Sequence, residues 1–521
     1  MALSKSDLDF LSLAKAAFEA DPSKTALRFE NEALSYADMD AAIDRHAAAL
    51  AECGISSGDR VGLMILNRPS LAALLFACWR LGAVAVPTNV FYRLPEVKYA
   101  LAHCGARLLI VQDELASEAV GLADSIPSME RVYALHKSVE GLDGSWSDKV
   151  SAVDKNAPKV EIDPGWPAAI FYTSGSTSRP KGVTHTHAAV RSMIHSRCET
   201  MSYQADDCWL IGTGLVHVSG SYGSLFPALH IGASAIILER WSAGSFLDAV
   251  RRFKPTRALL LPAMAHDVLD HPDAASVDFS SFRSLEVGGD AVTAELYQKW
   301  SKVAGPTLFQ LLGMTECEGY CLTRPGGLIK QGSSGPPRIG VEVRVINEQG
   351  KQSPVNEIGE LTLRSDSMLE KYWDDPEHTS GAIREGWLFT SDLGHIDEDG
   401  FVWFAGRTSE MIIRRGSNIA PGEVENVLEA HPDVLEVVVV GVADSKIGQR
   451  VAAFIEPEPG CTADIEELKA FASKRLGNFK VPEYWSVLDS LPRNAVGKLD
   501  RKALHDLANV KDPVNAGFTF L

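Results

Sequence analysis

One run of small and hydroxyl residues has the composition of an anion-binding loop. It follows a short apolar stretch, 168–172, that predicts a buried strand, and Lys181 comes soon after it. Small residues let the backbone turn sharply, so several N–H groups can converge on one anion, while hydroxyls add donors and the lysine adds a positive charge. The pattern predicts a polyphosphate site, with an ordinary polar surface loop as the alternative. The run consists of Thr173, Ser174, Gly175, Ser176 and Thr177.

A second stretch ends in a threonine and a carboxylate. Thr315 and Glu316 close the stretch 310–316, which follows a predicted strand at 307–309. A hard divalent cation prefers carboxylate oxygen and neutralises phosphate charge during a displacement, and any such role for Glu316 depends on the family resemblance given below. Taken alone, Glu316 could equally be a solvated carboxylate on the surface.

Two further features acquire a chemical role only through their motifs. Lys498 lies in the stretch 491–501, and its charge would offset the repulsion between two anions if the motif places it between them. Gly288 and Gly289 end a predicted strand at 285–287, where the lack of a Cβ atom lets the backbone approach a ligand. Single lysines are usually on the surface and glycine pairs are usually turns, so both roles depend on the surrounding motifs.

The loop before Lys181 is not a Walker A loop, which has glycine directly before its lysine and Ser or Thr directly after it. Here Pro180 precedes the lysine and Gly182 follows it. The stretch instead resembles the nucleotide-binding loop of the AMP-forming acyl-CoA synthetases, a superfamily that also contains firefly luciferase and the adenylation domains of peptide synthetases. The resemblance covers almost the entire chain, from about residue 24 to 505, with motifs in the family's order at 171–183, 215–220, 285–291, 310–316, 387–394, 406–410, 414–425 and 491–501.

This resemblance implies roles for single residues. Lys498 would bridge the substrate carboxylate and the α-phosphate, and Thr315 and Glu316 would complete the catalytic set, with Glu316 on Mg²⁺. Asp392 would accept both ribose hydroxyls, and Arg407 would contact ribose or phosphate. The implied ATP-binding set is Thr173, Ser174, Gly175, Ser176, Thr177, Lys181, Gly289, Asp290, Leu312, Gly313, Met314, Thr315, Asp392, Arg407 and Lys498.

The same resemblance implies sites for the other substrates. His217 would gate the acyl pocket, and Glu410 would be the hinge between two domains. The implied acyl-binding set is His217, Val218, Gly220, Tyr222, Gly288 and Gly313. The implied CoA-binding set is Arg415, Gly416 and Ser417.

Several positions depart from the family's usual residues. Leu312 stands where the family has a tyrosine stacked on adenine, and its loss weakens base binding by about 1 kcal/mol. Glu410 stands where the hinge is usually Asp, which keeps the charge on a longer arm. Ser178 and Ser391 replace glycine, Asp290 replaces alanine and Val496 replaces serine.

Composition limits the partners and the compartment. The 521 residues carry 50 Lys and Arg against 68 Asp and Glu, a net charge of −18, which disfavours a nucleic-acid partner. The eight cysteines include no Cys-x-x-Cys pair, which favours reduced thiols in a cytoplasmic protein. The longest apolar stretch, 71–86, is interrupted by Arg80 and Gly82, so we expect no transmembrane segment. Lys5, Asp7 and Asp9 interrupt the N-terminus, so we also expect no secretory signal. A homodimer is a further open prediction.

Strands and helices alternate along the chain, which predicts an α/β fold. We expect a large N-terminal domain, 1–407, that binds ATP and the acid in two doubly wound, parallel αβ subdomains before and after Phe171. A small β subdomain follows from 335 to 369. A mobile α+β C-terminal domain, 408–521, would carry the catalytic lysine and the CoA-tunnel loop.

The sequence therefore predicts a carboxylic acid–CoA ligase that uses ATP, Mg²⁺ and CoA through an acyl-adenylate. The mostly apolar or small acyl-site residues predict a short-to-medium or aromatic acid, and an inward-pointing Glu318 would repel a dicarboxylate. Two alternatives stay open: an adenylation enzyme that loads a carrier-protein thiol, and a non-catalytic nucleotide-binding relative. A luciferase-like oxidase is a third.

Overall fold

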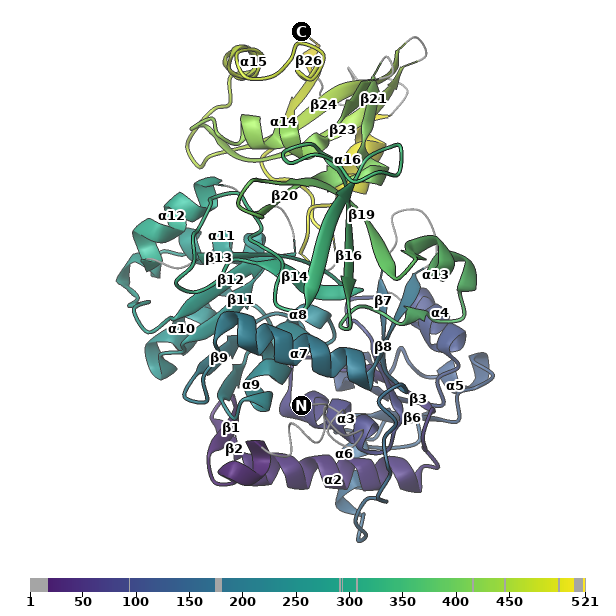
Figure 1. The fold of residues 1–521 in the computed structure, drawn as a ribbon. Helices are drawn as coiled ribbons and strands as arrows, with labels where there is room; N and C mark the ends of the chain where they lie inside the picture. The colour runs from purple at the N-terminus through teal and green to yellow at the C-terminus, as the bar shows by residue number, and fades with distance from the viewer. Residues whose placement is uncertain are drawn as a thin grey trace.

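The computed structural model describes residues 17–92, 94–173, 180–289, 292, 294–305, 308–414, 417–444, 447–494, 497–509 and 519–520. These residues form four β-sheets (Figure 1). Two large sheets and a smaller antiparallel sheet belong to the N-terminal part, and the fourth sheet lies in the C-terminal part at the top of Figure 1. The predicted α/β architecture is confirmed, whereas the boundary between 407 and 408 stays a prediction.

The first large sheet has the strand order β17-β8-β7-β4-β3-β5-β6. Its central strands are parallel, and their apolar runs are buried, as expected for a sheet covered on both faces. The strands are β3 (Arg60–Met64), β4 (Val84–Pro87), β5 (Leu108–Val111), β6 (Arg131–Ala134), β7 (Pro167–Thr173), β8 (Lys181–Thr186) and β17 (Lys371–Tyr372). The helices near them in sequence are α2 (Tyr36–Glu52), α3 (Pro69–Arg80), α4 (Leu94–Cys104), η2 (Asp113–Leu115), α5 (Leu122–Ser125), α6 (Trp146–Ser151) and α13 (Pro376–Ala382).

The second large sheet has the order β14-β13-β12-β11-β9-β10-β1-β2. Its strands are β1 (Thr25–Phe29), β2 (Glu32–Ser35), β9 (Cys208–Ile211), β10 (Ser234–Ile237), β11 (Arg257–Leu260), β12 (Ser284–Gly288), β13 (Leu308–Met314) and β14 (Cys317–Leu322). The intervening helices are α7 (His187–Met201), α8 (Val218–Gly220), the π-helix η3 (Ser221–Leu225), α9 (Phe226–His230), α10 (Ala243–Phe253), α11 (Pro262–Asp270), η4 (Ala274–Ser276) and α12 (Ala294–Ala304).

The division of the chain between these sheets differs from the prediction that they separate at Phe171. The hairpin β1–β2 belongs to the second sheet, because β1 pairs with β10. Strand β8, which follows Phe171, pairs antiparallel with β7 in the first sheet. Both large sheets are therefore mixed rather than wholly parallel, since each contains antiparallel strand pairs.

The small β subdomain and the C-terminal part complete the fold. The small sheet contains β15 (Val341–Ile346), β16 (Gly359–Ser365), β18 (Ile383–Arg384), β19 (Trp387–Ile396) and β20 (Val402–Arg407), so it extends well beyond the predicted end at 369. The C-terminal part contains η5 (Thr408–Glu410), β21 (Ile412–Arg414), β22 (Ser417–Ile419), α14 (Pro421–Leu428), β23 (Val434–Asp444), β24 (Gly448–Pro457), α15 (Ile465–Ser473), β25 (Tyr484–Val487), α16 (Arg501–Ala508) and β26 (Thr519–Phe520).

The largest apolar cluster joins the two large sheets. Residues 71–79 of α3 are all buried in it, as expected for a helix that is apolar on every side. Aromatic rings from separate elements meet there, including Trp79 and Phe226, whose ring centroids are 4.8 Å apart. This packing fixes the relative position of the sheets, and hence of the strand ends that carry the candidate site.

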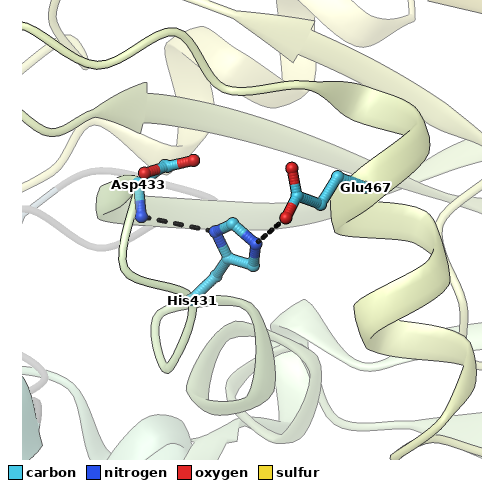
Figure 2. Close-up of side chains that lie close together, drawn as sticks. All are labelled: His431, Asp433 and Glu467. Carbon is cyan, nitrogen blue, oxygen red and sulfur yellow. Dashed lines mark hydrogen bonds and ion pairs between the residues drawn. The ribbon is translucent and has the colours of Figure 1, made fainter.

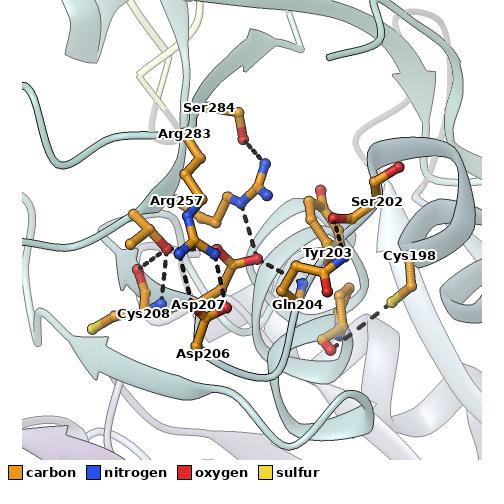
Figure 3. A network of polar contacts seen from close by, with 12 residues as sticks. Cys198, Ser202, Tyr203, Gln204, Asp206, Asp207, Cys208, Arg257, Arg283 and Ser284 are labelled. Carbon is orange, nitrogen blue, oxygen red and sulfur yellow. Dashed lines mark hydrogen bonds and ion pairs between the residues drawn. The ribbon is translucent and has the colours of Figure 1, made fainter. Parts of the chain in front are cut away.

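A polar network holds the N-terminal ends of three neighbouring strands in the second sheet (Figure 3). Asp207, which is fully buried, pairs with Arg257 at 3.1 Å and with Arg283 at 3.0 Å. Arg257 also donates to the hydroxyl of Ser284, the first residue of β12. The network lies at the opposite strand ends from Gly288, so it supports the sheet without contacting the site.

None of the helices in the described part of the chain has both the length and the apolar character that crossing a bilayer needs.

Candidate active site

The predicted phosphate loop connects two paired strands. Thr173 ends β7 and Lys181 begins β8, and these two residues are cross-strand partners. The loop members Ser174, Gly175, Ser176 and Thr177, together with Ser178, lie outside the described residues. The ammonium of Lys181 lies 5.2 Å from the ring centroid of Tyr372, a cation–π contact.

Glu316 lies close to the same tyrosine. Thr315 and Glu316 form the turn between β13 and β14, and the Glu316 side chain is largely buried. The Tyr372 hydroxyl donates to Glu316 Oε1 at 2.8 Å. Tyr372 therefore contacts Lys181 with its ring and Glu316 with its hydroxyl, which brings the cation of one motif and the carboxylate of another to one place.

The predicted ribose carboxylate faces an arginine across a strand pair. Asp392 on β19 and Arg407 on β20 are register partners, and Arg407 Nε lies 3.1 Å from Asp392 Oδ1. Burial raises the pKa of Asp392 to about 6; the Arg407 charge opposes this shift and the nearby Glu316 charge adds to it. Ser391 has a φ of +61°, the left-handed conformation that explains why glycine is usual at this position.

Lys498 reaches the N-terminal part of the chain. Its turn is held by Asn494, whose backbone N–H donates to Lys498 O at 2.7 Å and whose Oδ1 accepts the Lys498 N–H at 3.1 Å. The Lys498 ammonium lies 3.9 Å from the position that a Cβ atom would occupy on Gly289. Asp290, the next residue, lies outside the described residues, as does Val496.

His217 adjoins this lysine. Burial lowers the pKa of His217 to about 4, and the Lys498 charge acts in the same direction, so the imidazole is neutral at pH 7. Asn89 Nδ2 lies 3.3 Å from His217 Nε2. The predicted gate is thus a neutral ring between the catalytic-lysine candidate and the helices α8 and η3.

The other predicted acyl-site residues surround these helices and the ends of β12 and β13. Val218 is half-buried, and Tyr222 is fully buried against the ring of Phe171, with centroids 5.2 Å apart. Three glycines pack so tightly that a side chain would clash: a Cβ atom would lie 2.3 Å from a backbone atom at Gly220 and at Gly313, and 2.4 Å at Gly288. Leu312 and Met314 are partly buried against the small β subdomain.

Glu318 differs from its predicted role. Its carboxylate is buried and accepts two hydrogen bonds from Arg197 Nη1, at 3.0 and 2.8 Å. The same guanidinium also binds Glu286, so Arg197 compensates the Glu318 charge only in part and weakens the predicted repulsion of a dicarboxylate.

The predicted hinge contacts the C-terminal part of the chain. Glu410 ends η5, and its Oε2 lies 3.8 Å from Arg501 Nε. Arg501 also pairs with the buried Glu425 through two bonds of 2.6 and 2.9 Å. For the predicted CoA loop, Arg415 and Gly416 lie outside the described residues, and Ser417 begins β22.

A separate cluster in the C-terminal part consists of His431, Asp433 and Glu467 (Figure 2). His431 Nδ1 accepts the backbone N–H of Asp433 at 3.3 Å, and Nε2 lies 3.7 Å from Glu467 Oε1. Both ring nitrogens already face protein partners, so we assign no cation to this cluster.

Sequence reasoning missed several residues of the site. Tyr372 is 56 positions from Glu316 in the sequence and belongs to none of the motifs, so no local pattern could have identified it. Asn89 beside His217 and Arg197 beside Glu318 were missed for the same reason.

Comparison with known proteins gives matches over most of the chain. The family model for AMP-binding enzymes matches residues 14–373, and the model for their C-terminal domain matches 423–498. A fatty acid–[acyl-carrier-protein] ligase of Streptomyces coeruleorubidus is 32% identical over 93% of this chain and 94% of its own length. An indoleacetate–CoA ligase of Aromatoleum aromaticum is 31% identical over 94% and 96%. Among solved structures, an anthranilate CoA ligase in complex with anthranoyl-AMP superimposes with a TM-score of 0.90 at 27% identity, covering 98% of this chain and 99% of that one.

Proposed function

Because the chain belongs to the family of AMP-binding enzymes, we propose that it is an AMP-forming carboxylic acid–CoA ligase. In the first half-reaction a carboxylate oxygen of the acid attacks the α-phosphorus of ATP, and pyrophosphate leaves. In the second, the CoA thiol attacks the acyl carbon of the adenylate, and AMP leaves while the thiol proton is lost. Dividing the reaction in two converts a poor acyl donor into a good one.

The position of Lys498 beside Gly289 and His217 is the observation that carries the proposal. An ammonium at this point can contact both the acid's carboxylate and the α-phosphate, which otherwise repel each other. Its charge also stabilises the extra negative charge that develops as the new P–O bond forms. A neutral His217 adds no second positive charge beside Lys498.

Lys181 and Glu316 would act at the other end of the phosphate chain. Tyr372 contacts both residues, which supports a common role toward one triphosphate. The donor set fits Mg²⁺, because Glu316 is a carboxylate whose orientation is set by the Tyr372 hydroxyl. A magnesium ion bound there would neutralise charge on the leaving pyrophosphate.

The nucleoside end would be bound by Asp392, which is ionised at neutral pH and can accept both ribose hydroxyls. Thioester formation would need the C-terminal domain to rotate about Glu410, so that Lys498 withdraws and the loop containing Arg415 and Gly416 reaches the site. All eight cysteines are free, which supports a cytoplasmic location.

A panel of carboxylic acids tests the proposal. Each reaction contains ATP and Mg²⁺, and both pyrophosphate release and AMP release are measured. Three conditions are compared: CoA added, holo-carrier protein added, and no thiol added. We expect one class of acids to give pyrophosphate release and CoA-dependent AMP release with thioester formation. AMP release that depends on holo-carrier protein and is not increased by CoA would favour the carrier-loading alternative. ATP binding without pyrophosphate release for any acid would indicate a non-catalytic relative.

A further inference from the structure

We infer that Leu311 and a buried charged cluster of Glu286, Arg197 and Glu318 close the acyl pocket. The enzyme would then accept compact acids, such as those with one aromatic ring or a short chain, and reject long-chain fatty acids. This inference rests on the proposed ligase function, since it names the size class of the acid.

Leu311 covers the first part of the pocket wall. Gly288 on β12 and Leu311 on β13 are register partners. A Cβ atom on Gly288 would lie 2.6 Å from both Cγ and Cδ1 of Leu311. The leucine side chain therefore bends over the glycine and occupies the space that the missing side chain leaves open.

The charged cluster lies deeper along the same wall. Glu286 precedes Gly288 by two residues on β12, so it faces the same side of the sheet, about 7 Å further from the strand end. Arg197 of α7 binds Glu286 through Nη2 and Glu318 through Nη1. The Tyr203 hydroxyl donates to the other oxygen of Glu286 at 2.6 Å.

The cluster is fully enclosed. The side chains of Arg197, Glu286 and Glu318 are 0%, 1% and 4% exposed. These ion pairs join α7 to β12 and β14, so the ions cannot move apart without leaving charges unpaired inside the protein.

The opposite wall rests directly on this cluster. A Cβ atom on Gly223 of η3 would lie 2.9 Å from Glu318 Oε1 and 3.1 Å from Leu259 Cδ1. The neighbouring Tyr222 is fully buried, with its ring 5.7 Å from that of Phe226. Helix η3, which lies close after the gate His217 in the sequence, thus packs so tightly against the charged cluster that not even a methyl group would fit between Gly223 and Glu318.

An acyl group that enters beside His217 consequently meets Leu311 first and paired charges next. A longer alkyl chain would have to displace those charges rather than enter apolar space, and burying a hydrocarbon chain among ions gains nothing. Glu318 would thereby act on specificity by closing the pocket rather than by repelling a second carboxylate.

The test is a series of acids of graded size with the full-length protein. Benzoate, phenylacetate, cinnamate, butyrate, hexanoate, octanoate, dodecanoate and hexadecanoate are compared by kcat/KM for pyrophosphate release. We expect dodecanoate and hexadecanoate to fall at least about 100-fold below the best compact acid. For acids one step larger than the best wild-type substrate, Leu311→Ala should raise kcat/KM about tenfold, when each value is divided by the kcat/KM of the same protein for that best substrate.

Val287→Ala is the matched control. Val287, on the neighbouring strand β12, is buried like Leu311, but it packs in the apolar cluster on the opposite face of the sheet. It should leave the size profile unchanged. Efficient use of hexadecanoate by the wild type would overturn the inference while leaving the ligase function intact. Equal shifts of the profile in both variants would also overturn it. If Leu311→Ala does not fold, the wild-type series alone tests the inference. If the wild type releases no pyrophosphate with any acid, the ligase assignment and this inference are both rejected.

Discussion

Lys498 and Gly289 meet although they belong to different parts of the chain: the lysine Nζ is 3.9 Å from the position that a Cβ atom would take on the glycine. Gly289 directly follows β12 of the second large sheet and has a φ of +89°, and Lys498 belongs to a turn of the C-terminal part. The proposed adenylate formation would use this contact, because it brings an ammonium next to the end of β12.

Lys498→Ala should separate the two half-reactions. Loss of the ammonium removes charge stabilisation at the α-phosphate, so we expect pyrophosphate release to fall by about 10²–10³-fold. Thioester formation from preformed acyl-adenylate should stay within a few-fold of the wild type, because Lys498 has no role there. Lys502→Ala, an exposed lysine paired with Asp506, is the control. Equal losses in both half-reactions would contradict the assignment of Lys498.

ATP affinity should depend on the ionisation of Asp392. Its pKa of about 6, raised by burial, means that the carboxylate becomes protonated as the pH falls from 7 to 5 and accepts fewer ribose hydrogen bonds. The ratio of ATP affinities of the wild type and Asp392→Asn, measured by calorimetry, should fall about tenfold over this range. Comparing the two proteins cancels the titration of ATP itself. A constant ratio would show that Asp392 does not bind ribose.

The same shift affects folding stability with a defined sign. The pKa of Asp392 is raised from 3.8 to about 6 in the folded state, so its contribution to stability is present below 3.8 and is lost as the pH rises through 6. Asp392→Asn should therefore become more favourable relative to the wild type as the pH rises from 4 to 7, as read from urea unfolding at each pH.

Ser391→Gly should stabilise the protein. Ser391 adopts a φ of +61°, where a side chain is strained and glycine is not, so we expect a gain of about 0.5–1 kcal/mol. Thermal unfolding at fixed pH measures the change. Ser380→Gly in α13 is the control, and it should destabilise, since glycine costs stability in a helix. A loss of stability in Ser391→Gly would mean that the serine side chain contributes more than the strain it carries.

Arg197→Met should be strongly destabilising. The substitution leaves two buried carboxylates, Glu286 and Glu318, without their cation, and breaking a buried ion pair in this way costs about 3–5 kcal/mol. Arg251→Met provides the comparison, because Arg251 pairs with exposed Asp248 and Asp273 and should cost less than about 1 kcal/mol. Similar urea midpoints for the two variants would show that the Arg197 charge does not stabilise the buried cluster.

The sequence by itself determined the family, the α/β class and most of the local structure. Period and composition are local properties, so the buried strand ending at Gly288, the helices and the strands of the C-terminal part could be predicted from neighbouring residues. The order of the motifs predicted the family, which the family models confirm.

Only the tertiary structure decided which distant residues meet. The hairpin β1–β2 joins the second sheet through β10, Tyr372 binds Glu316, and Arg197 binds Glu318. These contacts join positions 56 to more than 200 residues apart, and they depend on how whole sheets pack rather than on any local pattern. Glu318 illustrates the consequence, because its role changed from a charge facing the substrate to one half of a buried ion pair once Arg197 was seen beside it.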